Sequence, residues 1–235
     1  VEVLIGHNEC NVIIETNVGI KKIDIVNILE RITGSNKIKL NLKIVPQDEK
    51  LAKNQSERIK CGDNGIFKGV PLNNLEKQIS KLARKLYDNI PYDGKYILTE
   101  DQLIVCQSNA TNEKIQNIIN EVMDTTNLKI IINPLGEWEG GTNVDTGATN
   151  RKLGSDMAQS VTGGGIHGKD LSKADVSINI YAFKKAQETG KEVELFCAIG
   201  DDMIDGKPYN EIVDEAREYI NNIGGFEKFA EWGLY

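Results

Sequence analysis

Histidine and cysteine are scarce in this chain, and their spacing excludes several kinds of catalytic site. Only two histidines and four cysteines occur among 235 residues, and no CxxC pair suggests a zinc site. No Ser/His/Asp or Cys/His set is visible, so nothing indicates a protein nucleophile. The cysteines suit reduced thiols in a cytoplasmic protein. Three of them are expected to be buried because each lies in an apolar, strand-like run: Cys10, Cys106 and Cys197.

The chain also lacks an excess of positive charge and any long apolar run. Its net charge of −7 argues against general binding of nucleic acid. No apolar run is long enough to cross a bilayer, and no signal-peptide pattern opens the chain, so we expect a cytoplasmic location and no membrane partner. Hydrophobic residues make up 40% of the chain, which is enough for a core.

Strand-like and helix-like patterns follow one another along the sequence. Alternating or clustered apolar residues predict strands at 10–16, 37–45, 96–107, 128–132 and 191–199. Apolar residues at helical spacing predict one helix from an Asp24 cap to Gly34, and others around 75–86, 111–123, 174–185 and 212–220. A tight turn is predicted at 61–65 and a polar loop at 47–61. This order indicates an α/β (α+β) fold of about three related units, each a sheet with helices on one face.

The stretch from Gly136 to Ser177 is unusually rich in glycine. It holds nine of the chain's 22 glycines, and such residues let the backbone approach a ligand closely. Its charged residues include the cations Arg151, Lys152, Lys169 and Lys173 and the carboxylates Asp145, Asp156, Asp170 and Asp175. Free backbone N–H groups, fixed cations and spare carboxylates are what a metal-bound polyphosphate needs. No GxxxxGK[ST] occurs, so the stretch is not a P-loop.

The motifs of this stretch resemble those of S-adenosylmethionine synthetases (methionine adenosyltransferases). That family's GD-x-GLTGRK element, GGG-containing loop and GKD-x-x-K-x-D-x-S run have counterparts at 145–152, 163–165 and 168–177. The resemblance implies an enzyme that joins ATP to L-methionine with Mg²⁺ and K⁺ as cofactors. It also implies three α/β domains around a pseudo-threefold axis, in a homodimer or a dimer of dimers. The units are then expected at 1–60 (incomplete), 61–134 and 135–235, with segments that interleave.

The resemblance assigns the phosphate-binding residues. The polyphosphate is expected to contact the four cations that would also carry catalysis: Arg151, Lys152, Lys169 and Lys173. Lys95, in an Asp93-Gly94-Lys95 run that is similar to the family's PD-x-K, is a further candidate phosphate contact. Asp175 is the expected Mg²⁺ ligand, and it could at the same time stabilise the N-terminus of the following helix.

Other substrate contacts follow from the earlier motifs. Asp63, in a GDNG run that resembles GDQG, and Asp145 are expected at the methionine amine or the ribose, although both also suit ordinary turns. Trp138 either stacks on adenine or is a buried core residue. Gln47 is a candidate for closing over methionine. Glu15, in an IET run that resembles CET, is the expected K⁺ ligand, since an unpaired carboxylate in an apolar strand would be costly.

Two motifs of the family, HPDK and GGE, are absent from these residues. His7 is not followed by Pro-Asp-Lys, and His167 stands alone in the glycine-rich stretch. Either an HPDK segment precedes Val1 or the chain is a reduced member. Three functions therefore stay open: an active synthetase, a homologue that binds ATP or S-adenosylmethionine, and a hydrolase acting on polyphosphate alone.

Overall fold

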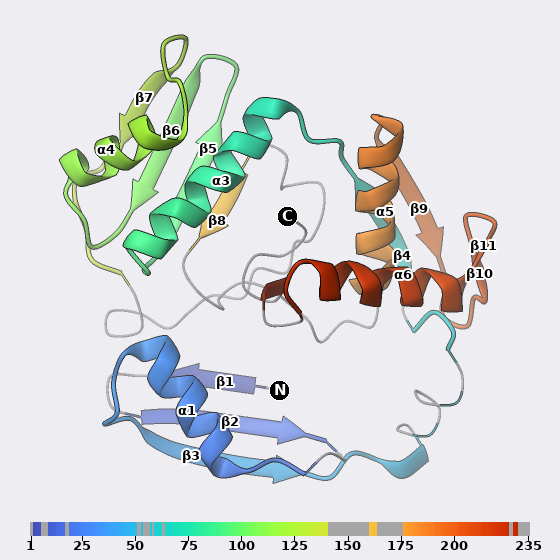
Figure 1. The fold of residues 1–235 in the computed structure, drawn as a ribbon. Coiled ribbons are helices and arrows are strands. Elements are labelled where there is room, and N and C mark those ends of the chain that lie inside the picture. The colour runs from blue at the N-terminus through green and yellow to red at the C-terminus, as the bar shows by residue number, and fades with distance from the viewer. Residues whose placement is uncertain are drawn as a thin grey trace. The chain divides into compact units, whose positions relative to one another are not determined.

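The chain divides into two compact units. The computed structural model describes residues 2–5, 9–16, 19–50, 53, 57, 59–62, 64–140, 160–163, 176–225, 228 and 229. The first unit is formed by Val1–Ile59, and the second begins at Lys60 and includes the C-terminal part of the chain (Figure 1). Within these described ranges, no helix is both long and apolar enough to cross a membrane.

The first unit is a three-stranded sheet with one helix against it. Strand β1 (Glu2–Ile5) is antiparallel to β2 (Glu9–Glu15), and β2 is parallel to β3 (Lys39–Val45) through the crossover helix α1 (Lys22–Thr33). The side chains of β2 alternate between buried and exposed, as in a strand with one face against a core. Its buried face packs against α1 and β3, and the core residues are Cys10, Val12, Ile14, Leu29 and Leu40.

The two ends of α1 differ in how well the sequence predicted them. Gly34 closes the helix in the left-handed region, with φ of 66°, and its N–H donates to the carbonyl of Glu30. The predicted cap at Asp24 is wrong, because the helix begins at Lys22 and Lys21 is its extended N-cap residue. Asp24 instead lies in the first turn, where its negative charge favours the helix dipole.

The second unit contains a four-stranded sheet in the order β7-β6-β5-β8. Its strands are β5 (Gly94–Leu98), β6 (Gln102–Gln107), β7 (Lys129–Ile132) and β8 (Ser160–Gly163). The single strand predicted at 96–107 is wrong, because β5 and β6 form a hairpin in which the Thr99 N–H donates to the Gln102 carbonyl at 2.9 Å. Strand β8 lies inside the glycine-rich stretch and had no local strand signal.

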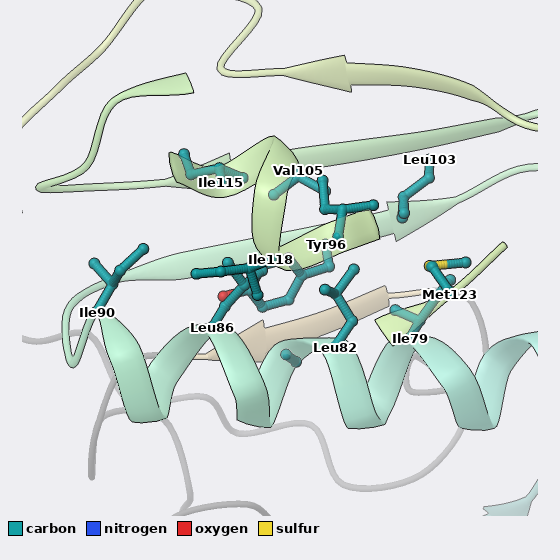
Figure 2. Packing of buried hydrophobic residues seen from close by; sticks show 12 residues of the cluster. Ile79, Leu82, Leu86, Ile90, Tyr96, Leu103, Val105, Ile115, Ile118 and Met123 are labelled. Atoms are coloured by element: carbon teal, nitrogen blue, oxygen red, sulfur yellow. The ribbon is translucent and has the colours of Figure 1, made fainter. Parts of the chain in front are cut away.

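Helices α3 (Asn74–Asn89) and α4 (Asn112–Val122) cover one face of this sheet (Figure 1). Asn73 and Glu76 form a capping box at the start of α3, and Thr111 caps α4 as predicted. The predicted stripe of Ile79, Leu82 and Leu86 points from α3 into a core with Tyr96 of β5 (Figure 2). This packing fixes the positions of β5 and β6, which carry the candidate site.

A smaller sheet of the second unit joins segments that are far apart in the sequence. Strand β4 (Gly65–Gly69) is antiparallel to β9 (Val193–Cys197), and α5 (Val176–Thr189) packs against β4. Strand β4 was not predicted, and the turn predicted at 61–65 therefore ends one residue too late. Since β4 precedes α3 while β9 follows α5, this sheet crosses the expected boundary between residues 134 and 135.

The C-terminal part adds a short hairpin and a helix. Strands β10 (Met203–Ile204) and β11 (Lys207–Pro208) pair around Asp205 and Gly206, both with positive φ. Helix α6 (Tyr209–Asn222) then packs on α5. Lys185 of α5 bonds Asp205, and Lys207 bonds Glu215 of α6. These ion pairs join the hairpin to both helices.

The four cysteines are free thiols, as expected. Cys10, Cys61 and Cys197 are buried, and burial raises the pKa of the Cys10 thiol. Cys106 is only partly buried, so the expected full burial of this residue is wrong. It lies opposite Lys95 in the β5–β6 register, on the face of the sheet away from α3 and α4.

Alkaline pH is expected to weaken the packing of α6. Burial raises the pKa of Tyr219 to about 12, while the charge of Arg84 opposes this shift. An unfolded tyrosine ionises near pH 10, so the folded chain holds this proton more tightly. The stability that this proton gives the folded state is complete below about pH 10 and is lost as the pH rises to about 12. Tyr219→Phe should make the fall in urea midpoint over this range shallower, and Tyr92→Phe, at an exposed tyrosine, should leave it unchanged. Equal slopes for Tyr219→Phe and the wild type would contradict this prediction.

Candidate functional site

The candidate site lies where β5, β6 and β8 meet. In the sheet register, Gly94 of β5 faces Gln107 of β6 on one side and Gly163 of β8 on the other. The next residue, Lys95, is exposed and lies on the face of the sheet opposite Tyr96, which packs into the helix-covered core. We call Asp93, Gly94, Ser108, Asn109 and Gly140 the Asp93 corner.

The backbone of Asp93 is held tightly at this corner. Its carbonyl oxygen accepts hydrogen bonds from the Ser108 N–H at 2.9 Å, the Ser108 hydroxyl at 3.1 Å and the Gln107 side-chain amide at 3.1 Å. Ser108 and Gln107 are completely buried. The turn between α3 and β5 therefore has a fixed path, and Lys95 follows it by two residues.

The segment that leads into the glycine-rich stretch is bound to the same corner. Asn133, with φ of 42°, ends β7 and bonds the backbone of Gln107 through both ends of its amide. The chain then turns at Gly136, which has φ of 102°. Asn109 binds the next residues of the chain through two hydrogen bonds. Its N–H donates to the Trp138 carbonyl, and its side-chain oxygen accepts from the Gly140 N–H.

Gly140 lies directly against two side chains. A β-carbon at this position would lie 2.5 Å from Oδ2 of Asp93 and 3.0 Å from Oγ of Ser108. The close approach of Gly140 to the Asp93 carboxylate thus favours glycine, since a β-carbon would displace both side chains. Because Gly163 is in register with Gly94, two glycines of the glycine-rich stretch, Gly140 and Gly163, lie at the same corner.

Gly140→Ala is expected to lower the free energy of unfolding by about 1–2 kcal/mol, since the Asp93 carboxylate and the Ser108 hydroxyl must move. Urea unfolding followed by circular dichroism measures this change. Gly19→Ala is the matched control, because a β-carbon there meets nothing within 4 Å, and it should change the stability by less than about 0.5 kcal/mol. Equal midpoints for the two variants would show that Gly140 is not in close contact with Asp93.

The structure describes four of the predicted site residues. Lys95 and Trp138 belong to the second unit, where the 40% exposed side chain of Trp138 excludes the buried-core alternative. Glu15 and Gln47 belong to the first unit, at the end of the parallel strands β2 and β3, where Glu15 is in register with Val45. Glu15 is exposed, so its carboxylate bears no burial cost and the argument from a costly buried charge does not hold.

The other predicted site residues lie outside the described residues: Asp63, Asp145, Arg151, Lys152, Lys169, Lys173 and Asp175. Within the described ranges, no three His, Cys, Asp or Glu side chains gather into a metal site. The proposed Mg²⁺ contact therefore depends on Asp175, and the proposed K⁺ contact on the exposed carboxylate of Glu15. Of the predicted site residues, the structure places Lys95 and the backbone of Trp138 at the Asp93 corner, beside Gly140 and Gly163 of the glycine-rich stretch.

Four polar residues of this site were not predicted from the sequence: Gln107, Ser108, Asn109 and Asn133. A signal for Gln107 was present, because it follows Leu103 and Val105 on the inward-facing positions of an alternating strand. A polar residue at such a position must find hydrogen bonds inside the protein. Asn133 begins the Asn133-Pro134-Leu135-Gly136 run, which was interpreted as a strand end and as the counterpart of the family's NP-x-G, but no contact was predicted for Asn133 itself.

The chain matches no family model and no curated protein in sequence. Among solved structures, it is similar to that of an unusual S-adenosylmethionine synthetase from Campylobacter jejuni. The TM-score is 0.62 at 14% sequence identity, and the match covers 98% of this chain and 83% of the other. This likeness establishes a mixed α/β fold similar to that of an S-adenosylmethionine synthetase, whereas the pseudo-threefold arrangement stays a prediction.

Proposed function

We propose that this protein is an S-adenosylmethionine synthetase, which forms S-adenosylmethionine from ATP and L-methionine and releases phosphate and pyrophosphate. The observation that carries the proposal is the Asp93 corner: two glycines of the glycine-rich stretch, Gly140 and Gly163, lie there beside Asp93 and Gly94, directly before Lys95. The order of motifs in that stretch and the fold similarity to a synthetase support the same function. A homodimer or a dimer of dimers is part of the proposal.

The reaction needs charge stabilisation rather than a nucleophilic side chain. The methionine sulfur attacks C5′ of the ribose and displaces triphosphate, on which negative charge builds. Water then hydrolyses the triphosphate to phosphate and pyrophosphate. Fixed cations close to that charge lower the barrier. We assign this role to Arg151, Lys152, Lys169 and Lys173, with Lys95 as a further phosphate contact. The glycines let backbone N–H groups reach the same oxygens.

The remaining residues align the two substrates. Trp138 presents an exposed ring that suits stacking on adenine. Asp63 and Asp145 bind the methionine amine or the ribose, and Gln47 closes over methionine. Alignment of this kind is worth several kcal/mol to a two-substrate reaction. We assign Mg²⁺ to Asp175, where it would neutralise phosphate charge when bound, and K⁺ to Glu15.

The absence of HPDK and GGE favours two alternatives, a homologue that only binds ATP or S-adenosylmethionine and a hydrolase acting on polyphosphate. One experiment separates all three functions. The protein is incubated with ATP, Mg²⁺, K⁺ and labelled methionine, and both labelled product and phosphate are measured. Labelled S-adenosylmethionine is the expected result. Phosphate release that is independent of methionine would indicate the hydrolase, and saturable ATP binding with neither product would indicate the binding homologue.

A further inference from the structure

Gln107 connects the core of the second unit to the Asp93 corner. It is the last residue of β6, and its side chain is completely buried. Its Oε1 accepts a hydrogen bond from the Tyr96 hydroxyl at 2.5 Å, and its Nε2 donates to the Asp93 carbonyl at 3.1 Å. A single side-chain amide therefore joins a core tyrosine to the backbone that precedes Lys95.

The surroundings of the amide fix its orientation. Three more carbonyl oxygens, those of Ile90, Tyr92 and Ser108, lie within 3.5 Å of Nε2. Only the NH₂ end of the amide can face carbonyl oxygens, so the Oε1 end must face the tyrosine hydroxyl, which then donates. Burial raises the pKa of Tyr96, and the hydroxyl remains a donor at neutral pH. If the oxygen and nitrogen ends of the amide were swapped, buried polar groups would lose their hydrogen bonds.

The side-chain amide of Gln107 also lies directly against Gly94. A β-carbon at Gly94 would overlap the Tyr96 hydroxyl and lie 2.6 Å from Oε1 of Gln107. The turn at Asp93 thus cannot move inward, and the three hydrogen bonds to the Asp93 carbonyl keep it from moving outward. Lys95 extends from the next pleat onto the exposed face of the sheet.

We infer that Gln107 is a positioning residue, which holds the Asp93 turn so that the ammonium group of Lys95 reaches the substrate phosphates. This inference rests on the proposed function. Gln107 touches no substrate itself, because it lies on the helix-covered side of the sheet while Lys95 lies on the other. Small displacements of a charged group cost a large share of its effect on rate, so the path of the backbone at Asp93 matters for turnover.

A double-mutant cycle tests this inference on the full-length chain. Gln107→Leu keeps the volume and removes the amide, and it should lower kcat roughly tenfold to a hundredfold. In a Lys95→Ala background it should cost much less, because the group that Gln107 positions is already gone. Additive losses in the two backgrounds would overturn the inference, since a general weakening of the fold does not depend on Lys95. Gln102→Leu, at the other end of β6, is the matched control and should leave kcat unchanged.

Amide hydrogen exchange gives a readout that needs no activity. The Ser108 N–H should exchange at least about tenfold faster in Gln107→Leu than in the wild type, while amides within α4 and the Gln102→Leu protein stay unchanged. An unchanged rate at Ser108 would overturn the inference. If the wild-type chain forms no S-adenosylmethionine, the proposed function fails, and exchange at Ser108 still decides whether Gln107 holds the Asp93 turn.

Discussion

Replacing Gly69 by alanine is expected to lower the free energy of unfolding by about 3 kcal/mol, at the upper end of what overpacking usually costs. Gly69 ends β4 directly against the backbone of α5. A β-carbon there would overlap the carbonyl group of Ala182 and lie 2.9 Å from the Phe183 nitrogen. Backbone atoms cannot turn aside as the end of a side chain can, so α5 would have to move away from the β4–β9 sheet.

Urea unfolding followed by circular dichroism measures this effect. Gly65→Ala is the matched control, because Gly65 begins the same strand and a β-carbon there meets only the Phe67 ring, at 3.6 Å and beyond. The control should change the stability by less than about 1 kcal/mol. Similar midpoints for the two variants would show that β4 does not lie directly against α5.

The elements that the sequence predicted are those whose signal is local. Helix α3 shows a repeating apolar stripe, and the alternation of β2 and β3 is visible without knowledge of their partners. A buried face leaves such a pattern in every segment that contributes to it. For the same reason, the core around Leu82 and Leu86 could be predicted from one helix alone.

The elements that escaped prediction depend on partners that are distant in the sequence. Strand β4 reads Gly-Ile-Phe-Lys-Gly, which looks like the end of a turn, and it becomes a strand by pairing with β9. Strand β8 lies among glycines and pairs with β5. Strand propensity is weak and depends on context, so neither short segment could be recognised before its partner was known.

The motifs of the candidate site could be predicted from the sequence, but the residues that hold them in place could not. Lys95 and the glycine-rich stretch were recognisable by residue type and order. The attachment of Gly140 to the Asp93 corner depends on Asn109, and the path of the Asp93 turn depends on Gln107; both hydrogen bonds join residues far apart in the sequence. A side-chain amide has many possible partners, and only the fold selects among them.

The largest expected effect on activity is that of Lys169→Ala. In the proposed reaction, negative charge develops on the polyphosphate, and a fixed ammonium group stabilises the transition state more than the bound substrate. Loss of one such contact typically lowers kcat by about 10²- to 10³-fold. Steady-state rates of S-adenosylmethionine formation, with circular dichroism to verify folding, measure this effect.

Lys191→Ala is the matched control for this prediction, because Lys191 is an exposed lysine that follows α5. A solvated surface charge contributes little to a distant reaction, since salt and water screen it, so the control should keep full turnover. Lys169→Arg should retain part of the activity, because it keeps the charge but changes the geometry of its donors. If Lys169→Ala turns over as fast as Lys191→Ala, Lys169 does not contact the polyphosphate, and charge stabilisation falls to Arg151, Lys152 and Lys173. If Lys169→Ala loses only part of the turnover and Lys169→Arg turns over as fast as the wild type, Lys169 acts through its charge alone.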